Sequence, residues 1–356
     1  MLQDNFDRES FRPEEIDILF GLESFQKKHA GLIVIDKYEE MLEELFFLRN
    51  PRYRFEDGHE NNLKEFIDNY PDHGHWFYFP WMNSIIHYLS ENEHLEVRTG
   101  RNKNLINKEE QLKFYNSHVA VFGMSVGSHV ALTISMTGGA KYIHLADLDI
   151  ISGSNLNRIR SGFSQVGLAK VKSVARQIYE INPYADITIH EDGVTEVNLN
   201  KMINEEDLDL IVEEMDNPFF KVRVRELARP KGIPVIMAAD NGDGVNVDVE
   251  RYDLDSQTPL LHDIIPNIKS DIFKNTNPKE LVGIIAKMAG AKYASERMLE
   301  SVSEVGKSLY SWPQLGTAAT MCGSVLSNLG RRIILGENIE TGRYIINEKE
   351  MFKKVL

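Results

Sequence analysis

Residues 118–128 read HVAVFGMSVGS, in which a short apolar run leads into a turn with glycine at positions 123 and 127. A buried strand, a tight turn and a helix in this order begin a βαβ unit. The turn has the pattern Gly-x-Ser-x-Gly, so it meets the dinucleotide-binding pattern Gly-x-Gly-x-x-Gly only in part: Ser125 stands where glycine would allow close approach to pyrophosphate. The same letters fit the nucleophile turn of serine hydrolases. The loop alone therefore leaves both chemistries open, as well as a plain βα turn.

Short apolar runs alternate with amphipathic helical stretches after this loop. Alternating units of this kind form a mostly parallel sheet with right-handed crossovers, so we expect a Rossmann-like, doubly wound α/β fold. The alternation at 245–249 indicates a strand outside this series, and 279–335 has helical spacing. The expected strands are 118–122, 142–146, 187–189, 208–212 and 234–237, and the expected helices are 130–136, 171–179, 199–203 and 219–228.

The N-terminal part has a different pattern. Apolar residues between 13 and 70 recur at spacings of three and four with charged residues between them, which predicts amphipathic helices. The aromatic block at 75–81 fits an interdomain seam better than stacking on a ligand base. We expect a mainly helical N-terminal domain at 1–96, the Rossmann-like domain at 97–255, and a C-terminal helical extension at 256–356 that packs on it.

Composition excludes several classes of protein. The net charge of −14 disfavours nucleic acid and anionic membrane surfaces as partners. The single cysteine, Cys322, excludes an intrachain disulfide and a paired Cys-x-x-Cys zinc site, and it fits a reducing compartment. The first residues lack the cationic and apolar regions of a secretion signal, and no apolar run is long enough to span a bilayer. We expect a cytoplasmic protein.

Asp147 favours a nucleotide site over a hydrolase. It ends the apolar run at 142–146, close to the spacing of about 20 residues at which a Rossmann acid meets a ribose hydroxyl. A serine hydrolase has no use for this acid. The helix that follows Gly127 would offer unpaired amides to a phosphate.

Two later cations extend the site beyond dinucleotide binding. Attack on the α-phosphorus of a triphosphate needs positive charge, which Arg158 and Lys170 would supply. Nicotinamide chemistry needs no such pair. The alternative for both residues is ordinary solvated charge, Arg158 in a polar loop and Lys170 on an exposed helical face.

Asp216 is the candidate for magnesium. It follows the apolar run at 208–212, at the carboxyl end of an expected parallel strand, where open α/β sheets bind their ligands. Magnesium prefers one or two carboxylates together with phosphate oxygens and water. Glu213, Glu214 and Asp149 are nearby alternatives. Asp216 has a second possible role as the cap of the helix that follows it.

These segments, in this order, resemble the ThiF/MoeB/HesA family of ubiquitin-activating-enzyme-like adenylyltransferases. Several separated motifs are far more specific than one glycine loop. The sequences GMSVGSHVAL and WPQL are also similar to a little-characterised bacterial branch, some members of which carry a nitroreductase-like flavin domain that is not evident here. The resemblance covers roughly 98–253 and is strongest at 145–149 (LADLD), 154–158 (SNLNR), 167–171 (GLAKV) and 181–183 (INP).

The resemblance implies a role for each candidate residue. ATP and Mg²⁺ are the implied cofactors. The implied phosphate loop is Gly123, Ser125 and Gly127; Asp147 would hold the ribose with Asp149 beside it; Asn155, Arg158 and Lys170 would hold phosphates; and Asp216 would hold Mg²⁺.

The resemblance also implies a partner subunit. Residues 98–102 (RTGRN) look like the arginine-rich segment that reaches into the partner's active site in this family, which makes Arg101 a catalytic candidate in a homodimer. The family reaction is attack by a substrate carboxylate on ATP, which yields an acyl-adenylate and pyrophosphate.

Several departures from the family pattern narrow the prediction. The loop lacks the usual Gly-Gly pair, the zinc-binding cysteine pairs are absent, and no cysteine stands where many members form a thioester. Cys322 lies among small residues and is expected to be a packing residue. We therefore expect adenylation without thioester transfer.

The sequence thus predicts ATP-dependent adenylation of a peptide, a small carrier protein or a small acid. An NAD-dependent oxidoreductase would use the same loop and Asp147 but leaves the two cations unused. A serine hydrolase built on Ser125 would need a base such as His262. A non-catalytic nucleotide-binding scaffold is the last alternative, because the loop is altered.

Overall fold

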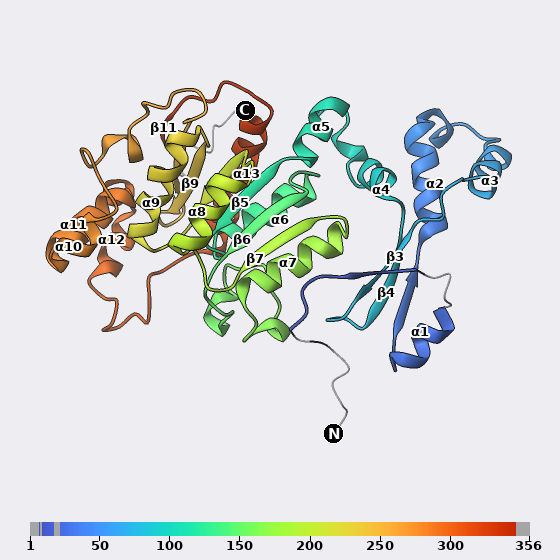
Figure 1. Ribbon diagram of the computed structural model, residues 1–356, viewed down its shortest axis with the longest axis horizontal. Helices are drawn as coiled ribbons and strands as arrows, with labels where there is room; N and C mark the ends of the chain where they lie inside the picture. Colours follow the sequence, from blue (N-terminus) through green and yellow to red (C-terminus); the bar gives the residue numbers. More distant parts are fainter. Residues whose placement is uncertain (1–6, 8, 18–21, 347–356) are drawn as a thin grey trace, which may run out of the picture. The chain divides into compact units, whose positions relative to one another are not determined.

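The computed structural model describes residues 7, 9–17 and 22–346 of the 356-residue chain (Figure 1). It contains two compact units, one formed by residues 1–111 with 175–184 and the other by residues 112–174 with 185–356. In the described ranges, no helix combines the length and hydropathy that crossing a membrane requires.

The first unit combines helices with a four-stranded sheet of order β1-β3-β4-β2. Strands β1, β3 and β4 pair antiparallel, whereas β2 runs parallel to β4. A small core of Leu42, Leu45 and Leu89 lies under its helices. The elements are β1 (Glu14–Ile16), α1 (Leu22–Lys28), β2 (Ile33–Asp36), α2 (Tyr38–Arg49), α3 (Glu60–Asp68), β3 (His75–Phe79), β4 (Ser84–Tyr88) and α4 (Glu91–Arg98).

This sheet was not predicted from the helical spacing of the N-terminal part. The aromatic block forms β3, in which Phe77 and Phe79 are buried, and it pairs with β4 through Phe77 opposite Ile86. Aromatic and β-branched residues favour such half-buried strands. The helices α2 and α3 do follow the expected spacing.

The second unit contains a seven-stranded sheet of order β11-β10-β9-β8-β5-β6-β7. Strands β5 to β9 are parallel to their neighbours, and β10 and β11 are added antiparallel. The doubly wound fold is thereby confirmed, with all five expected strands present. Their bounds are β5 (His118–Phe122), β6 (Tyr142–Ala146), β7 (Asp186–His190), β8 (Leu210–Glu213), β9 (Val235–Asp240), β10 (Val245–Glu250) and β11 (Gly342–Ile346).

Helices cover both faces of this sheet. Side chains of α8 and α9 share one core with Phe122 of β5 and Val235 of β9. Helix α13 packs on α6 and on β8 to β10, and a Cβ at its Gly330 would lie 3.7 Å from Cδ1 of Ile236. Val235 and Ile236 are successive residues of β9, so their side chains point to opposite faces of the sheet. The layer of α8 and α9, which Val235 contacts, therefore covers one face, and α13, which Ile236 contacts, covers the other.

The expected helices of this region are all present, and those beyond residue 279 are confirmed as α11 to α13. Helices α5 and α7 contribute residues to both units. The bounds are α5 (Lys108–Tyr115), α6 (Gly127–Met136), α7 (Lys170–Ile181), α8 (Glu196–Glu205), α9 (Pro218–Ala228), α10 (Ile272–Asn275), α11 (Pro278–Met288), α12 (Glu296–Val302) and α13 (Gly316–Ile334).

The strand order places a topological switch beside β5. The chain proceeds from β5 to β6 and β7 on one side and then returns to β8 on the other. Open α/β sheets bind ligands at the carboxyl ends of their strands at such a point. A ligand site is therefore expected at the loops after β5, β6 and β8.

Candidate functional site

Gly123 brings the ends of β5 and β8 into close contact. Its φ of +87° lies in the left-handed region, and a Cβ at this position would lie 2.3 Å from the carbonyl oxygen of Glu214. Both observations require glycine, because another residue would suffer backbone strain and overlap with the main chain. The loop then enters α6, whose N-cap residue Val126 makes no side-chain capping hydrogen bond. The first amides of a helix are free to bind an anion when no side chain caps them.

Substitution of Gly123 is a test of this loop. We expect Gly123→Ala to lower the free energy of unfolding by about 2–4 kcal/mol, from backbone strain and overlap with Glu214. Gly153→Ala is the matched control, because a Cβ at Gly153 would meet nothing within 4 Å. Urea denaturation of both variants measures the difference. Equal stability of the two variants would contradict the strain argument.

Asp147 fastens the loop to the end of β6. Its Oδ2 accepts from the main-chain N of Met124 at 2.5 Å, and its Oδ1 accepts from the main-chain N of Asp149 at 2.7 Å. Burial raises the pKa of the Asp147 carboxyl, although Lys170 and the two amides oppose that shift. A carboxylate has about four acceptor positions, so Asp147 retains capacity for a ribose hydroxyl. Its predicted ribose contact stays a prediction.

Lys170 is buried at the same edge of the sheet. It begins α7, is 6% exposed, and its Nζ lies 2.6 Å from Oδ2 of Asp149 and 3.9 Å from Oδ2 of Asp147. The alternative that Lys170 is an ordinary charge on an exposed helical face is therefore wrong. The two acids position a cation beside the loop.

Arg158 contacts the loop from the segment after β6. Its Nε donates to Oγ of Ser125 at 3.2 Å, and its Nη1 donates to the carbonyl of Ser154 at 3.2 Å and to Oδ1 of Asn157 at 3.0 Å. The structure thus brings Arg158 and Ser125 together. Arg158 therefore lies next to the glycine loop, at the same edge of the sheet as Lys170.

Asn155 has a local structural task. Its Oδ1 accepts from the main-chain N of Ser152 at 3.0 Å and closes a capping box at the short turn Gly153–Asn155. This turn leads directly to Arg158, so Asn155 orders the segment that carries the arginine. Its predicted phosphate contact stays a prediction.

Asp216 is exposed in the loop between β8 and α9. The cap of α9 is Asn217, whose Oδ1 accepts from the main-chain N of Phe219 at 3.0 Å and of Phe220 at 3.3 Å. The alternative that Asp216 caps this helix is therefore wrong. In the part of the chain that the structure describes, no three His, Cys, Asp or Glu side chains gather closely enough to hold a metal ion.

The other acids proposed for magnesium have different partners. Glu213 is fully buried, and its carboxylate binds Lys221 Nζ at 3.0 Å and Arg225 Nη1 at 2.8 Å. Arg225 also binds the buried Glu250, with Nε 2.5 Å from Oε2. Glu214 Oε1 accepts from the main-chain N of Ala238 at 2.7 Å. Glu213 and Glu214 therefore fix the chain just before the Asp216 loop to α9 and β9. The sequence analysis missed this structural role.

Two further candidates lie outside this group of contacts. Arg101 is exposed in a short turn, Gly100–Asn102, of the first unit, and its predicted place in a partner's site stays a prediction. His262 binds Asp248 of β10, with Nε2 3.2 Å from Oδ1. Among the described contacts none joins His262 to Ser125, which argues against the serine hydrolase.

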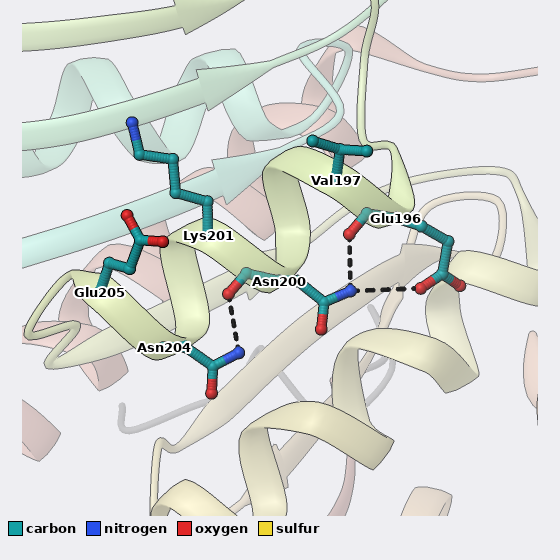
Figure 2. Close-up of a pocket in the computed structure, with 6 residues that line it drawn as sticks. All are labelled: Glu196, Val197, Asn200, Lys201, Asn204 and Glu205. Carbon is teal, nitrogen blue, oxygen red and sulfur yellow. Dashed lines mark hydrogen bonds between the residues drawn. The ribbon is translucent and has the colours of Figure 1, made fainter.

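A shallow hollow elsewhere on the second unit belongs to α8 alone (Figure 2). Asn200 Nδ2 donates to the carbonyl of Glu196 at 2.6 Å, and Asn204 Nδ2 donates to the carbonyl of Asn200 at 2.8 Å. These bonds are local to the helix. The hollow shares no lining residue with the loop, the acids or the two cations described above.

Comparison with known proteins identifies the family of this chain. The model of the ThiF family matches residues 99–353. The uncharacterized protein MT1398 of Mycobacterium tuberculosis is 34% identical over 269 residues, which are 75% of this chain and only 37% of that protein. The tRNA threonylcarbamoyladenosine dehydratase of Escherichia coli is 28% identical over 193 residues, 52% of this chain and 71% of that enzyme.

A solved structure shares the fold. That of Escherichia coli MccB with MccA-N7isoASN has a TM-score of 0.52 at 16% identity, and the likeness covers 88% of this chain and 85% of that chain. At this identity the likeness concerns the fold alone. The family assignment rests instead on the family model, which matches residues 99–353 and so more than half of the chain: the chain belongs to the ThiF family.

Proposed function

We propose that this chain is an ATP- and magnesium-dependent adenylyltransferase that activates the carboxylate of a peptide, a small carrier protein or a small acid. The observation that carries the proposal is the placing of two cations at one edge of the sheet: Arg158 donates to Ser125 of the glycine loop, and Lys170 lies beside Asp147, which bonds to the same loop. Cationic side chains held in place beside a glycine loop suit the phosphates of a nucleotide. Membership of the ThiF family supports the same reaction.

The proposed step transfers AMP to the acid. A carboxylate oxygen attacks the α-phosphorus of ATP, a new P–O bond forms, and the bond from the α-phosphorus to the bridging oxygen breaks. Pyrophosphate leaves with the electron pair of that bond. No general base is needed, because a carboxylate is already ionised at pH 7.

The protein would stabilise the charge that moves onto pyrophosphate. The start of α6, which no side chain caps, suits phosphate oxygens, and Arg158 and Lys170 supply the cations that this step requires. Asp147 would hold the ribose, and the exposed Asp216 has the chemistry of a magnesium ligand. Magnesium bound there would neutralise phosphate charge.

The proposal includes assembly as well. Arg101 would reach the site of a second copy, so the active form would be a homodimer in the cytoplasm. The glycine loop, Arg158 and Lys170 would all bind ATP. Other residues would therefore select the acyl substrate.

Pyrophosphate exchange tests the proposed function. Labelled pyrophosphate should enter ATP when a panel of peptides and small acids is supplied with Mg²⁺, and exchange should stop when EDTA removes the metal. Isothermal titration should show binding of ATP and not of NAD. Binding of NAD alone would favour the oxidoreductase, and ATP binding without exchange across the panel would favour a non-catalytic scaffold.

A further inference from the structure

Asp240 borders the candidate site from a strand that the reaction above does not use. It ends β9, which is the parallel neighbour of β8, so it lies at the same edge of the sheet as the Asp216 loop. The end of β9 is tied to that loop, since the main-chain N of Ala238 donates to Oε1 of Glu214.

The side chain of Asp240 is also linked to the Arg158 segment. Gln314, in the segment before α13, hydrogen bonds to the Asp240 carboxyl, and the Gln314 carbonyl accepts from Nδ2 of Asn157 at 2.8 Å. Arg158 and Asp216 lie close enough for their charges to act on Asp240. Asp240 therefore lies on the side of the site proposed for phosphates and metal, and not on the ribose side at Asp147.

Half of the Asp240 carboxyl lacks a partner. Its Oδ2 is buried and accepts no hydrogen bond from any described residue, although the residue as a whole is only half-buried. Burial raises the pKa of Asp240, and Gln314 and Arg158 oppose this shift only in part. Buried polar atoms without partners are rare and costly, so a missing donor is the simplest account of this one. Because the residue as a whole is half-buried, a change of its side-chain torsion on ligand binding would make this acceptor reachable.

The chemistry of the missing donor follows from the proposed reaction. In its ionised form the Asp240 carboxylate accepts hydrogen bonds and donates none, so phosphate oxygens and the reacting carboxylate are not partners of that form. The adenosine would lie toward Asp147. A group of the acyl substrate next to its carboxylate is the source that we favour, and a magnesium ion at Asp240 is the competing partner that the test below distinguishes. An amide N–H and an ammonium are the two forms such a group takes in peptides and amino acids.

We propose that Asp240 selects acyl substrates that carry an N–H donor beside the reacting carboxylate, an inference that rests on the adenylation proposed above. Asp240 is thus a specificity-determining residue. It would bind the donor while Arg158 and Lys170 hold the phosphates, and this orients the carboxylate toward the α-phosphorus.

Two acids of nearly equal shape test this selection. N-acetylglycine carries an N–H where acetoxyacetate carries an oxygen, and glycine carries an ammonium at the same place. The wild-type protein should support pyrophosphate exchange with N-acetylglycine or glycine about 10- to 100-fold better than with acetoxyacetate. Asp240→Leu should bring this ratio close to one. Asp240→Asn keeps an acceptor without the charge, so it should retain a preference for the amide and lose a preference for the ammonium.

Asp243→Leu is the control, because Asp243 is exposed in the same turn and should leave the ratio unchanged. Equal use of the two acids by the wild type, or an unchanged ratio in Asp240→Leu, would overturn the inference. A higher magnesium requirement in Asp240→Asn with an unchanged ratio would make Asp240 a metal ligand and also overturn it.

Failure of the proposed function has a different signature. If no acid supports exchange, equilibrium binding of the same two acids is measured with a non-hydrolysable ATP analogue present. A preference for N-acetylglycine that Asp240→Leu abolishes would then support the selection without the reaction. Equal binding, or binding of neither acid, would overturn it.

Discussion

Replacement of Arg158 by alanine is expected to lower the rate of pyrophosphate exchange by about 10²- to 10³-fold, the usual effect of losing one preorganised donor to developing charge. The substitution removes a cation whose Nε lies 3.2 Å from Oγ of Ser125. It also removes the bonds from this guanidinium to Ser154 and Asn157, which order the segment around Arg158. Initial rates at saturating ATP and acid measure the effect, with the thermal midpoint recorded for each variant.

Arg160→Ala is the matched control for this experiment. Arg160 lies two residues further along, is exposed, and binds Nδ1 of His129 through Nε at 3.2 Å. The same charge is removed, yet exchange should stay within about twofold of the wild type. Arg158→Lys keeps the charge without the planar fork of donors and should give an intermediate rate. If Arg160→Ala loses as much activity as Arg158→Ala, the effect belongs to overall charge and the assignment of Arg158 is wrong.

Replacement of Arg225 by methionine is expected to lower the free energy of unfolding by about 3–5 kcal/mol at pH 7. Glu213 and Glu250 are fully buried, and both bind the guanidinium of Arg225. Methionine fills similar space but carries no charge. Lys221 would then be left to pair with Glu213, and Glu250 would lose the cation that it binds. Urea denaturation gives the difference, and Arg225→Lys, which keeps a charge there, should recover part of it if the methionine variant fails to fold.

The matched control on the same helix is Arg223→Met. The partners of Arg223 are Glu196 and Glu226, and all three side chains are partly exposed, so less than about 1 kcal/mol should be lost. A loss below 1 kcal/mol in Arg225→Met as well would show that the buried charges do not need the arginine.

The stability difference between Arg225→Met and the wild type should depend on pH. Burial would raise the pKa of Glu213, but Lys221 and Arg225 lower it below its ordinary value. A carboxyl with a lowered pKa in the folded state stabilises the protein above its unfolded pKa, and this contribution is lost as pH falls through the folded pKa. The difference should therefore be largest near pH 7 and shrink as the medium is acidified below about pH 4, where glutamate takes up a proton.

The central sheet could be predicted because its signals are local. Strand β5 is a short apolar run, Gly123 ends it, and the next helix begins within a few residues. The same alternation gives β6 to β9 and the order of the candidate residues along the chain. The edge of the sheet at which those residues lie follows from the parallel arrangement of the strands.

Contacts between distant segments could not be predicted in the same way. The helical pattern around Lys170 is equally compatible with a solvated face, and only Asp147 and Asp149 at the end of β6 make it a buried cation. Asp and Asn are nearly equal as helix caps, so the pair Asp216-Asn217 left the cap of α9 open. The residue roles at the nucleotide stay predictions.

Glu213 and Glu214 show that strand register determines which partners two neighbouring side chains bind. They are adjacent in sequence, but successive side chains at a strand end point to opposite faces. Glu213 meets Lys221 and Arg225 of α9, whereas Glu214 turns to the main chain of Ala238 on β9. A sequence pattern does not give this register at the last residue of a strand.

The bonds of Asp147 couple two stretches of chain that are far apart in sequence. One carboxylate holds an amide of the loop after β5 and an amide of the loop after β6. Its Oδ2, which accepts from Met124, also lies 3.9 Å from Nζ of Lys170 at the start of α7. Transient opening of either loop would break bonds in the other, so both should fluctuate as one cooperative unit. Their main-chain amides should consequently exchange with deuterium at similar rates. A ligand that binds one loop should slow the exchange of amides in both.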